Sequence, residues 1–292
     1  SDVVGGKGAS LWAMTSKLGV PTPPGFTIGV NTCAMLGKSQ VTENFTATMD
    51  NAIARLEKET GKQLGCPENP LLLAVRSGAS VSMPGMMETI LNVGATPLTL
   101  PALHDITGDH FFVLDSYRRF LEGFCKSTLN IDHPMFNAQT SGQAGLADHI
   151  KDLETVVSER IGGEQLCDAR YLLTECIHAV IRSSSSATAQ AYRKKTGLPE
   201  SLGTAVTVQA MVFGNTGAGS GTGVVFSRDP NSGEKEICGD WISNAQGDDV
   251  VAGDSATSDI SVFGATHPSA YEELKLHLEP VSYTHLRAHE TG

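Results

Sequence analysis

The sequence has few cysteines, no long apolar run and no excess of basic residues. Its six cysteines include no C-x-x-C pair, so neither a disulfide framework nor a zinc ribbon is indicated. No apolar stretch approaches the roughly 20 residues that cross a bilayer, and no signal-peptide pattern is visible near the first residue. We therefore expect an intracellular, reducing compartment, either cytoplasm or an organellar matrix, and no membrane partner.

Basic residues are outnumbered by acidic ones, 21 to 32, which gives a formal net charge of −11. Nucleic acids and anionic membranes attract clustered Lys and Arg, so this charge argues against either as a partner. Any phosphate site must then be a local exception. The 292 residues, 40% of them hydrophobic, are enough for about two domains with real cores.

The texture of the sequence divides the chain into four stretches. Residues 1–106 mix Gly/Pro turns and short apolar runs with one helix, whereas residues 107–199 carry apolar stripes at helical spacing and are interpreted as a helical insert. In residues 200–279 the pattern changes, and residues of one kind recur at every second position. Residues 280–292 show no periodic pattern of apolar residues and no segment with which they would pair, so we expect them to lie outside the fold. Because the first motif has no strand before it, we interpret the chain as a fragment truncated at both ends.

The period of two begins at Thr204 and predicts a strand through residue 213. The glycine-rich residues 214–221 follow, and residues 222–227 predict a second strand. We expect the two strands to pair in antiparallel fashion and to form a lid.

The most informative stretch is residues 72–88, where a short apolar run leads into a loop of small residues. Residues 71–75 predict an interior strand with Arg76 at its exit. The small residues beyond it leave backbone N–H groups uncovered, which suits phosphate oxygens. Two interpretations are open for Arg76: a guanidinium fork that binds phosphate, or a structural ion pair with a local carboxylate such as Glu88.

Three weaker signals accompany the stretch at residues 72–88. Lys7 lies in a Gly-Gly-Lys-Gly turn that opens a helix, where an anion is favoured, although the turn alone is typical of a solvated lysine. The apolar pair Met211 and Val212 offers a slot whose backbone could read an adenine edge, or is part of an ordinary hairpin. Asp248 and Asp249 could face a magnesium ion or an ammonium group, or form a solvated turn.

Taken in order, these motifs resemble the N-terminal nucleotide-binding region of the pyruvate, phosphate dikinase family. The loop S-M-P-G-M-M separates this family from phosphoenolpyruvate synthases and glucan, water dikinases. The matching segments cover most of residues 1–255: G-G-K-G-A-S-L at 5–11, P-T-P-P-G-F-T at 21–27, V-R-S-G-A-S-V-S-M-P-G-M-M-E-T at 75–89, D-S-Y-R-R-F at 115–120, V-Q-A-M-V-F-G-N at 208–215, S-G-T-G-V at 220–224 and N-A-Q-G-D-D-V-V-A-G at 244–253.

The resemblance implies an α+β fold of the ATP-grasp type with a helical insert, incomplete at both ends, that binds ATP and Mg²⁺. Residues 1–106 and 200–279 would be its two lobes. In the family, the β-phosphoryl of ATP passes to a histidine on a separate domain and AMP is released. Phosphate takes the γ-phosphoryl, and a pyruvate-binding domain then makes phosphoenolpyruvate. The implied partners are ATP, phosphate, the phosphohistidine domain and the pyruvate-binding domain, in a homodimeric full-length enzyme.

Carried over by motif, the resemblance also implies roles for individual residues. The catalytic pair that holds the ATP phosphates would be Lys7 and Arg76. The loop that closes over them would include Ser82, Gly85 and Met86. The adenine pocket would be lined by Gln209, Met211 and Val212. The phosphates would be approached by Thr222 and Gly223, and the ribose or metal region would be met by Asp248 and Asp249.

The chain also departs from the family pattern. It stops before the acidic D-x-E-F-T and L-Q-T-R strands that supply the family's metal ligands, so the metal ligands are unknown here. It contains no T-S-H phosphohistidine signature, and we expect it to be inactive alone. Asp248 replaces a glutamate of the family, and Ser80 replaces an arginine. An alternative function is therefore a non-catalytic nucleotide-binding or regulatory module on the same scaffold.

Overall fold

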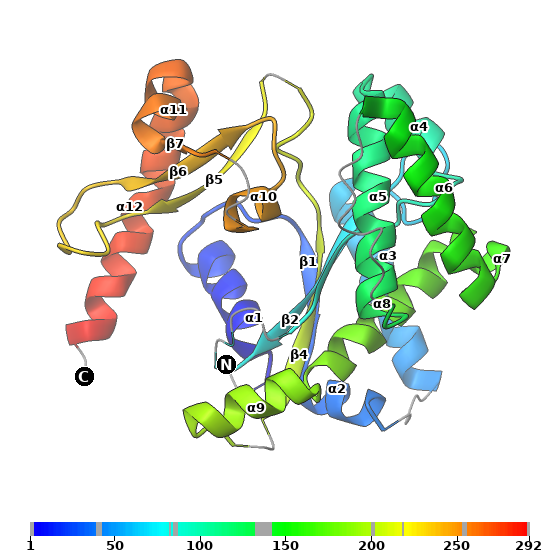
Figure 1. Ribbon diagram of the computed structural model, residues 1–292. Coiled ribbons are helices and arrows are strands. Elements are labelled where there is room, and N and C mark those ends of the chain that lie inside the picture. Colours follow the sequence, from blue (N-terminus) through cyan, green and yellow to red (C-terminus); the bar gives the residue numbers. More distant parts are fainter. Residues whose placement is uncertain are drawn as a thin grey trace. The chain divides into compact units, whose positions relative to one another are not determined.

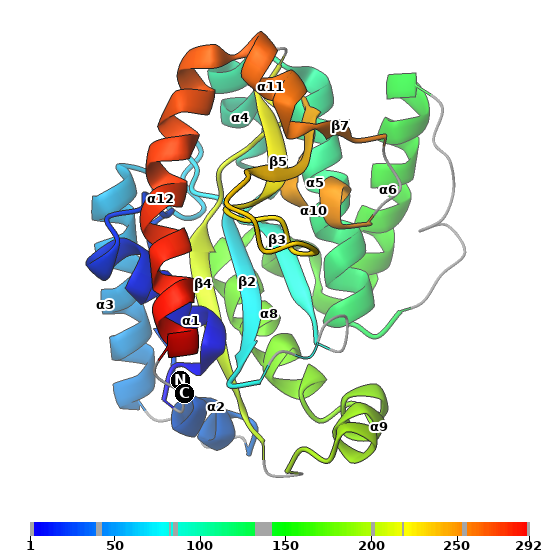
Figure 2. The ribbon, with the colours of Figure 1, turned by 90° about the vertical axis from the view of Figure 1, so that its left-hand side faces the viewer.

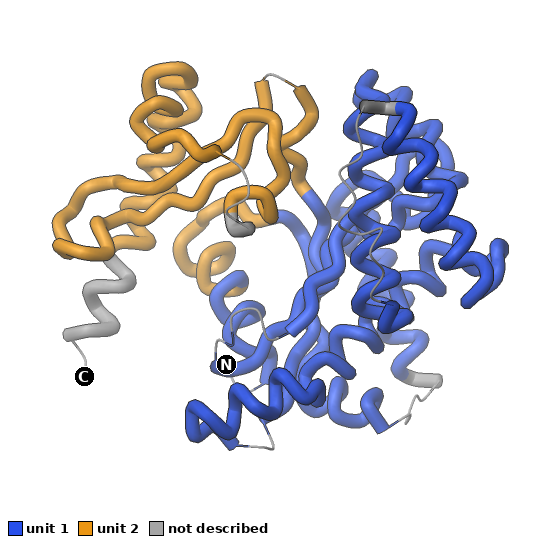
Figure 3. Tube along the Cα trace, in the orientation of Figure 1, with its two compact units in different colours: residues 1–11, 23–211 blue, residues 12–22, 212–292 orange. Residues whose placement is uncertain are grey.

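The computed structural model describes residues 3–38, 43–81, 83, 87–131, 142–199, 202–217, 219–252 and 256–290. The fold is α+β, with two antiparallel sheets among many helices (Figure 1). The chain divides into two compact units. Unit 1 contains residues 1–11 and 23–211, and unit 2 contains residues 12–22 and 212–292 (Figure 3).

Unit 1 is built on a four-stranded sheet in the order β1-β4-β2-β3. The strands are β1 (Gly25–Ile28), β2 (Leu73–Ala79), β3 (Thr89–Val93) and β4 (Thr204–Ala210), and each neighbouring pair is antiparallel. Figure 2 shows β4, β2 and β3 side by side. All seven residues of β4 are buried because β1 and β2 flank it on both edges.

Helices cover one face of this sheet. Strands β2, β3 and β4 contact α8 (Ala169–Ser183), and β3 also contacts α5 (His110–Ser127). The aromatic stripe of α5 is fully buried, with Tyr117, Phe120 and Phe124 at 0% exposure. Each helix starts at an aspartate whose side chain accepts backbone N–H groups, Asp109 for α5 and Asp168 for α8, which is the preferred N-cap arrangement.

The remaining helices of unit 1 surround this core (Figure 1). They are α1 (Gly5–Trp12, whose last residue is assigned to unit 2), α2 (Val30–Leu36), α3 (Glu43–Thr60), α4 (Leu100–Thr107), α6 (Gly142–Ile161), α7 (Gly163–Cys167) and α9 (Ala187–Thr196). Helix α1 lies on the face of the sheet opposite to α5 and α8 (Figure 1).

Unit 2 is built on a three-stranded sheet in the order β5-β6-β7. Its elements are the π-helix η1 (Ala13–Lys17), β5 (Gly221–Phe226), β6 (Cys238–Ser243), α10 (Gly247–Ala252), β7 (Ser258–Asp259), α11 (Ile260–Thr266) and α12 (Pro268–Glu290). Its core holds Trp241, whose ring centroid lies 5.1 Å from that of Phe263.

The structure divides the chain differently from the regions expected from sequence texture. The helices expected to form an insert at residues 107–199 pack on the first sheet and make its core. The second unit starts at Val212 rather than at residue 200, and residues 12–22 belong to it. The local sequence pattern could not show the boundary between the two units, because that boundary depends on which sheet each strand joins.

The expected lid is not formed. Strand β4 pairs with β1 and β2, whereas β5 pairs with β6. Because both edges of β4 are occupied, β5 has no edge of β4 to pair with. The strand expected through residue 213 also ends earlier, at Ala210.

The tail at residues 280–292 was expected to lie outside the fold, yet α12 continues through Pro280 to Glu290. Ser282 is only 3% exposed, and its Oγ accepts a hydrogen bond from Arg228 Nε at 3.0 Å. A proline inside a helix removes one backbone hydrogen bond, and α12 continues past Pro280 despite this loss. In the described part of the chain, no helix is both long and apolar enough to cross a bilayer.

Candidate functional site

Arg76 lies at the centre of β2 and not at its exit, and it is the one exposed residue of that strand. It pairs with Thr207 on β4 and with Thr89 on β3, and Thr207 in turn pairs with Thr27 on β1. Residues directly opposite each other in antiparallel strands project from the same face. One face of the sheet therefore carries a row of three threonines and Arg76, which runs across all four strands.

The hydroxyl row includes a direct contact between neighbouring strands. Thr27 Oγ1 lies 3.1 Å from Thr207 Oγ1, and Thr207 is only 2% exposed. On the opposite face, Val75 and Val208 are fully buried toward the helices. Both faces of β2 and β4 are buried except at Arg76, so burial alone does not distinguish the face of Thr207 from the face of Val75 and Val208.

Helix α1 approaches this polar face through glycines. A Cβ built on Gly5 would lie 1.6 Å from the carbonyl oxygen of Gly78 in β2, and Gly5 has φ +69°. A Cβ on Gly8 would lie 3.1 Å from Thr27 Oγ1, and one on Gly78 would lie 3.7 Å from Lys7 Cβ. Only glycine fits the contact at Gly5, because any side chain would overlap the β2 backbone. This close approach brings Lys7 onto the face that carries Arg76.

Lys7 and Arg76 influence each other electrostatically. The pKa of Lys7 is lowered, first by its partial burial and then by the positive charge of Arg76. Among the described residues, neither side chain forms an ion pair or a hydrogen bond. Two cations are thus held together without a described counter-charge, which is unfavourable unless an anion binds between them.

The expected alternative, an ion pair between Arg76 and Glu88, is not formed. Glu88 Oε2 accepts a hydrogen bond from Ser127 Oγ at 2.8 Å, and the Glu88 backbone N–H donates to Ser183 Oγ at 3.2 Å. Glu88 is therefore tied to the helices α5 and α8 and not to Arg76. No described carboxylate pairs with Arg76, and anion binding by Arg76 stays a prediction.

Gln209 lies on the same strand face as Thr207, two residues further along β4. Its side chain is 7% exposed, and Nε2 donates to the carbonyl of Pro23 at 2.9 Å. Met211 follows β4, and its Sδ accepts a hydrogen bond from the Asn92 backbone N–H at 3.0 Å. Val212 is 75% exposed and makes no backbone hydrogen bond to another described residue. The end of β4 is thus fixed, while the backbone of Val212 is available.

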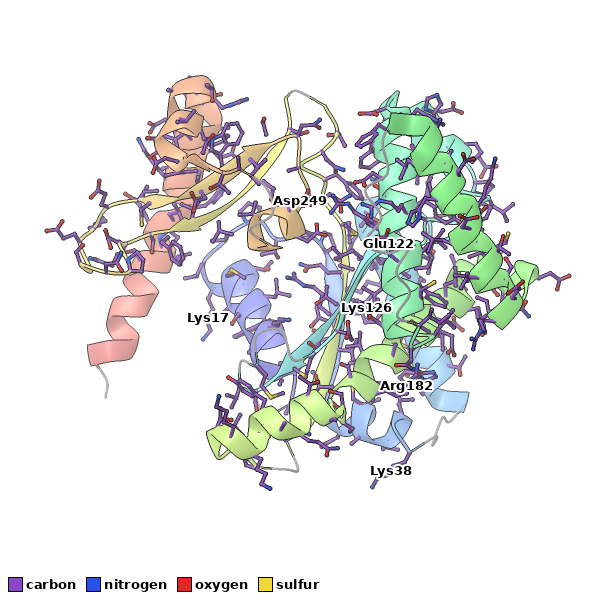
Figure 4. The ribbon with its side chains drawn as sticks, in the orientation of Figure 1. Lys17, Lys38, Glu122, Lys126, Arg182 and Asp249 are labelled. Carbon is purple, nitrogen blue, oxygen red and sulfur yellow. The ribbon has the colours of Figure 1, made fainter. Side chains whose placement is uncertain are left out.

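The other expected site residues belong to unit 2. Thr222 and Gly223 lie on β5, and a Cβ on Gly223 would come within 2.7 Å of Asp240 O. Asp248 and Asp249 lie in the first turn of α10, which contacts β5 (Figure 4). Asp249 Oδ2 accepts the Gln246 backbone N–H at 2.8 Å, so this carboxylate also caps its own helix.

The structure brings Lys7, Arg76 and Gln209 onto one face of the unit 1 sheet, and it collects Thr222, Gly223, Asp248 and Asp249 around β5 and α10 in unit 2. Ser82, Gly85 and Met86 lie outside the described residues. Sequence reasoning missed Thr27, Thr89 and Thr207. Their signal was threonine at alternate positions among apolar residues, but only the strand register shows that they flank Arg76.

The glycine-rich loop before β5 is closed by hydrogen bonds. Asn244 Oδ1 accepts the Gly217 N–H at 3.0 Å, and the Asn244 N–H donates to Ser220 O at 2.8 Å. Asn244 has φ 51°, a conformation that asparagine tolerates better than most residues. A Cβ on Gly214 would lie 2.4 Å from Ala245 O. The loop therefore packs against the turn that precedes α10.

Within the described ranges, no group of three or more His, Cys, Asp and Glu side chains is arranged to hold a metal ion. Mg²⁺ beside a nucleotide is usually held by one or two carboxylates together with waters and substrate phosphates. Asp248 and Asp249 therefore stay the predicted contacts of the ribose or metal region.

Comparison with known proteins decides the family. The family model described as "Pyruvate phosphate dikinase, AMP/ATP-binding domain" matches residues 34–278. The chain belongs to this family. The match contains Arg76, Gln209 and Asp248, and it confirms the resemblance found in the motifs.

Relatives of this dikinase domain share about two fifths of its residues. The chain is 39% identical over 293 residues to "Pyruvate, phosphate dikinase" of Rickettsia conorii, with 94% of the chain and 33% of that protein covered. It is 40% identical over 300 residues to the protein of the same name from Giardia intestinalis, at the same coverage. It is 41% identical over 268 residues to that of Rhizobium meliloti, covering 86% of the chain and 30% of the relative. The chain therefore spans about a third of the length of these relatives.

Proposed function

We propose that the chain binds ATP through the polar face of the unit 1 sheet and serves as the ATP-binding part of a pyruvate, phosphate dikinase of the ATP-grasp type. The observation that carries this proposal is the pair Lys7 and Arg76, two cations held side by side without a described counter-charge. A polyphosphate supplies that counter-charge. The membership in an AMP/ATP-binding domain family supports the same choice of ligand.

Each residue of the face has a distinct task in this proposal. Arg76 offers a planar fork that suits two phosphate oxygens, whereas Lys7 acts as a compact point charge. Thr27 and Thr207 fix the strand face beneath them through their hydroxyl contact. Phosphoryl transfer requires positioning and charge neutralisation more than covalent chemistry from the protein, and these residues supply both.

Recognition of the base is assigned to the end of β4. Nε2 of Gln209 donates to Pro23 O, so the group of this side chain that would accept the exocyclic amine of adenine is Oε1. Met211 supplies an apolar side chain, and the free backbone of Val212 supplies a donor and an acceptor. Roles for Thr222, Gly223, Asp248 and Asp249 in nucleotide binding, and for the loop at residues 82–87, stay predictions.

In the proposed reaction, the β-phosphoryl of ATP passes to a histidine on another domain of the full-length enzyme. Phosphate takes the γ-phosphoryl, and a pyruvate-binding domain completes the synthesis of phosphoenolpyruvate in a homodimeric enzyme. The family implies Mg²⁺ as well; Asp248 and Asp249 would be the candidates to hold it, and no step is assigned to the ion.

Calorimetric titration with ATP tests the proposal. Arg76→Ala and Lys7→Ala are each expected to weaken ATP binding by about tenfold, since one charge-assisted hydrogen bond is lost in each. Arg76→Lys is expected to recover only part of the affinity because the fork is lost. Arg55→Ala is the matched control, since Arg55 is exposed and pairs only with Glu59 on its own helix. Equal ATP affinity in all four variants would refute the proposal.

A further inference from the structure

A second cluster of cations lines a cavity elsewhere in unit 1. This cavity has a volume of about 380 Å³ and lies among the ends of α2 and α8, helix α9 and the start of β4. Its basic residues are Lys38, Arg182 and Arg193, and Figure 4 labels Lys38 just after α2 and Arg182 in the last turn of α8. None of these residues belongs to the face that carries Lys7 and Arg76.

Arg193 is the most buried of the three cations. It is 4% exposed, and its Nη1 donates to the carbonyl of Ser184 at 2.8 Å. Its Nε is buried and has no hydrogen-bond partner in the structure. No described carboxylate pairs with its guanidinium. A buried charge without a partner is strongly unfavourable, so the structure leaves a requirement for an anion at this position.

The other two cations reinforce this requirement. Arg182 makes one long hydrogen bond of 3.5 Å to Thr128 O, and the Lys38 side chain makes none to a described residue. None of the described residues that line the cavity is acidic. In a chain with 32 acidic and 21 basic residues, the charged residues described in the cavity lining have the opposite sign to the net charge of the molecule.

A purely structural role explains only part of this arrangement. The bond from Arg193 to Ser184 O caps the C-terminal end of α8, a common task for a basic side chain. That cap uses a single N–H of the five that a guanidinium carries. It does not account for the buried Nε, nor for Arg182 and Lys38 around the same cavity.

We propose that this cavity is a binding site for a phosphate group, either free phosphate or a small phosphate monoester, with Arg193 at its base. Arg182 and Lys38 supply exposed charges at the cavity wall, and the hydroxyl of the exposed residue Ser185 supplies an additional donor. Cavities of about 300–1,000 Å³ are typical of small-molecule sites, so the cavity has room for the carbon part of an ester. The apolar residues Cys33, Ile181 and Leu202 line it for such a part.

The test titrates the 292-residue chain with inorganic phosphate and, separately, with glycerol 3-phosphate, using calorimetry. Both titrations are done in an Arg76→Ala background, so that the proposed nucleotide site does not contribute. The double variant Lys38→Gln/Arg182→Gln changes only exposed residues and is expected to weaken binding by at least about tenfold. Arg193→Gln is expected to abolish binding, and its folding is checked by circular dichroism.

The matched control is Lys194→Gln, which removes one exposed charge from α9 next to Arg193 but outside the cavity lining. It is expected to leave both affinities unchanged. Tighter binding of phosphate than of the ester identifies free phosphate as the ligand, and the reverse order identifies a phosphorylated metabolite. Equal affinity in the double variant and its parent would overturn the proposal.

Glu200 provides a counter-test, because it lies two residues before Leu202 in the sequence and outside the described residues. If its carboxylate were the natural partner of Arg193, the parent would not bind phosphate and Glu200→Gln would. That outcome would also overturn the proposal. Binding by the parent, unchanged or strengthened in Glu200→Gln, supports it.

Discussion

Partial burial and then the positive charge of Arg76 lower the pKa of Lys7, and the two cations lie on the same face of the unit 1 sheet without a described counter-charge. Lys7 comes from the glycine turn at the start of α1, and Arg76 comes from the centre of β2. Residues so far apart in the sequence are brought together because Gly5 allows α1 to touch the backbone of β2. The predictions below follow from this pair and from the contacts that hold it.

The lowered pKa of Lys7 predicts a pH dependence of ATP binding. The folded protein releases the Lys7 proton below the ordinary lysine pKa of about 10.4, whereas the unfolded chain keeps it up to that value. ATP affinity should be highest below the lowered pKa and should fall as the pH rises through it. Without ligand, Lys7 should make folding stability rise with pH between the lowered and the ordinary pKa, as its charge penalty disappears.

Calorimetry between about pH 7 and 10 checks this dependence. Lys7→Arg keeps its charge throughout that range and should lose the decline in affinity. A decline of the same size in Lys7→Arg would show that another group is responsible.

Gly5→Ala should destabilise the protein more than an ordinary glycine substitution. The new Cβ would meet Gly78 O at 1.6 Å, so α1 must shift away from β2. We expect a cost of about 1–3 kcal/mol from this overlap in addition to the cost of a positive φ, together with weaker ATP binding. Gly61→Ala is the control, because Gly61 has φ +67° but open space around it. Equal losses in urea denaturation for both variants would contradict the close contact.

The hydroxyl contact between Thr27 and Thr207 predicts a coupled effect of two conservative substitutions. Thr27→Val and Thr207→Val each remove one of two oxygens that are 3.1 Å apart and keep the side-chain shape. A double-mutant cycle should show a coupling of about 0.5–1.5 kcal/mol in unfolding free energy. Additive losses would mean that the two hydroxyls do not interact in solution.

Ser282 tests whether the C-terminal helix belongs to the fold. Ser282→Ala leaves Arg228 Nε without its partner and should cost about 1 kcal/mol of stability. Ser269→Ala provides the comparison, because Ser269 is an exposed residue of α12 whose side chain makes no hydrogen bond to a described residue. Arg228→Ala and the double variant complete a double-mutant cycle. If the loss of stability in the double variant equals the sum of the losses in the two single variants, Arg228 and Ser282 do not interact.

The sequence predicted some elements well and others poorly, for physical reasons that particular residues show. The α+β class and the strand around Arg76 were expected, and the structure contains both. The position of Arg76 inside β2 was missed, because the polar residues after it suggested a loop whereas they continue the strand to Ala79. The lid was wrong because strand pairing is set by which edges are free, and a local pattern does not record that.

The cations of the site were found from the sequence, but their surroundings were not. Lys7 and Arg76 stand in recognisable glycine-rich motifs. Thr27 and Thr207 are ordinary strand residues by pattern, and only the register across three strands places them beside Arg76. Arg193 gave no signal at all, since a basic residue in the last turn of a helix normally faces solvent.

The most direct test of the central claim is a crystal structure of the chain with a non-hydrolysable ATP analogue. We predict phosphate oxygens within hydrogen-bond distance, about 2.7–3.2 Å, of the Arg76 guanidinium and of Lys7 Nζ. The base should lie near Gln209 and the backbone of Val212. A triphosphate bound elsewhere on the chain, with Arg76 and Lys7 free of it, would contradict the account.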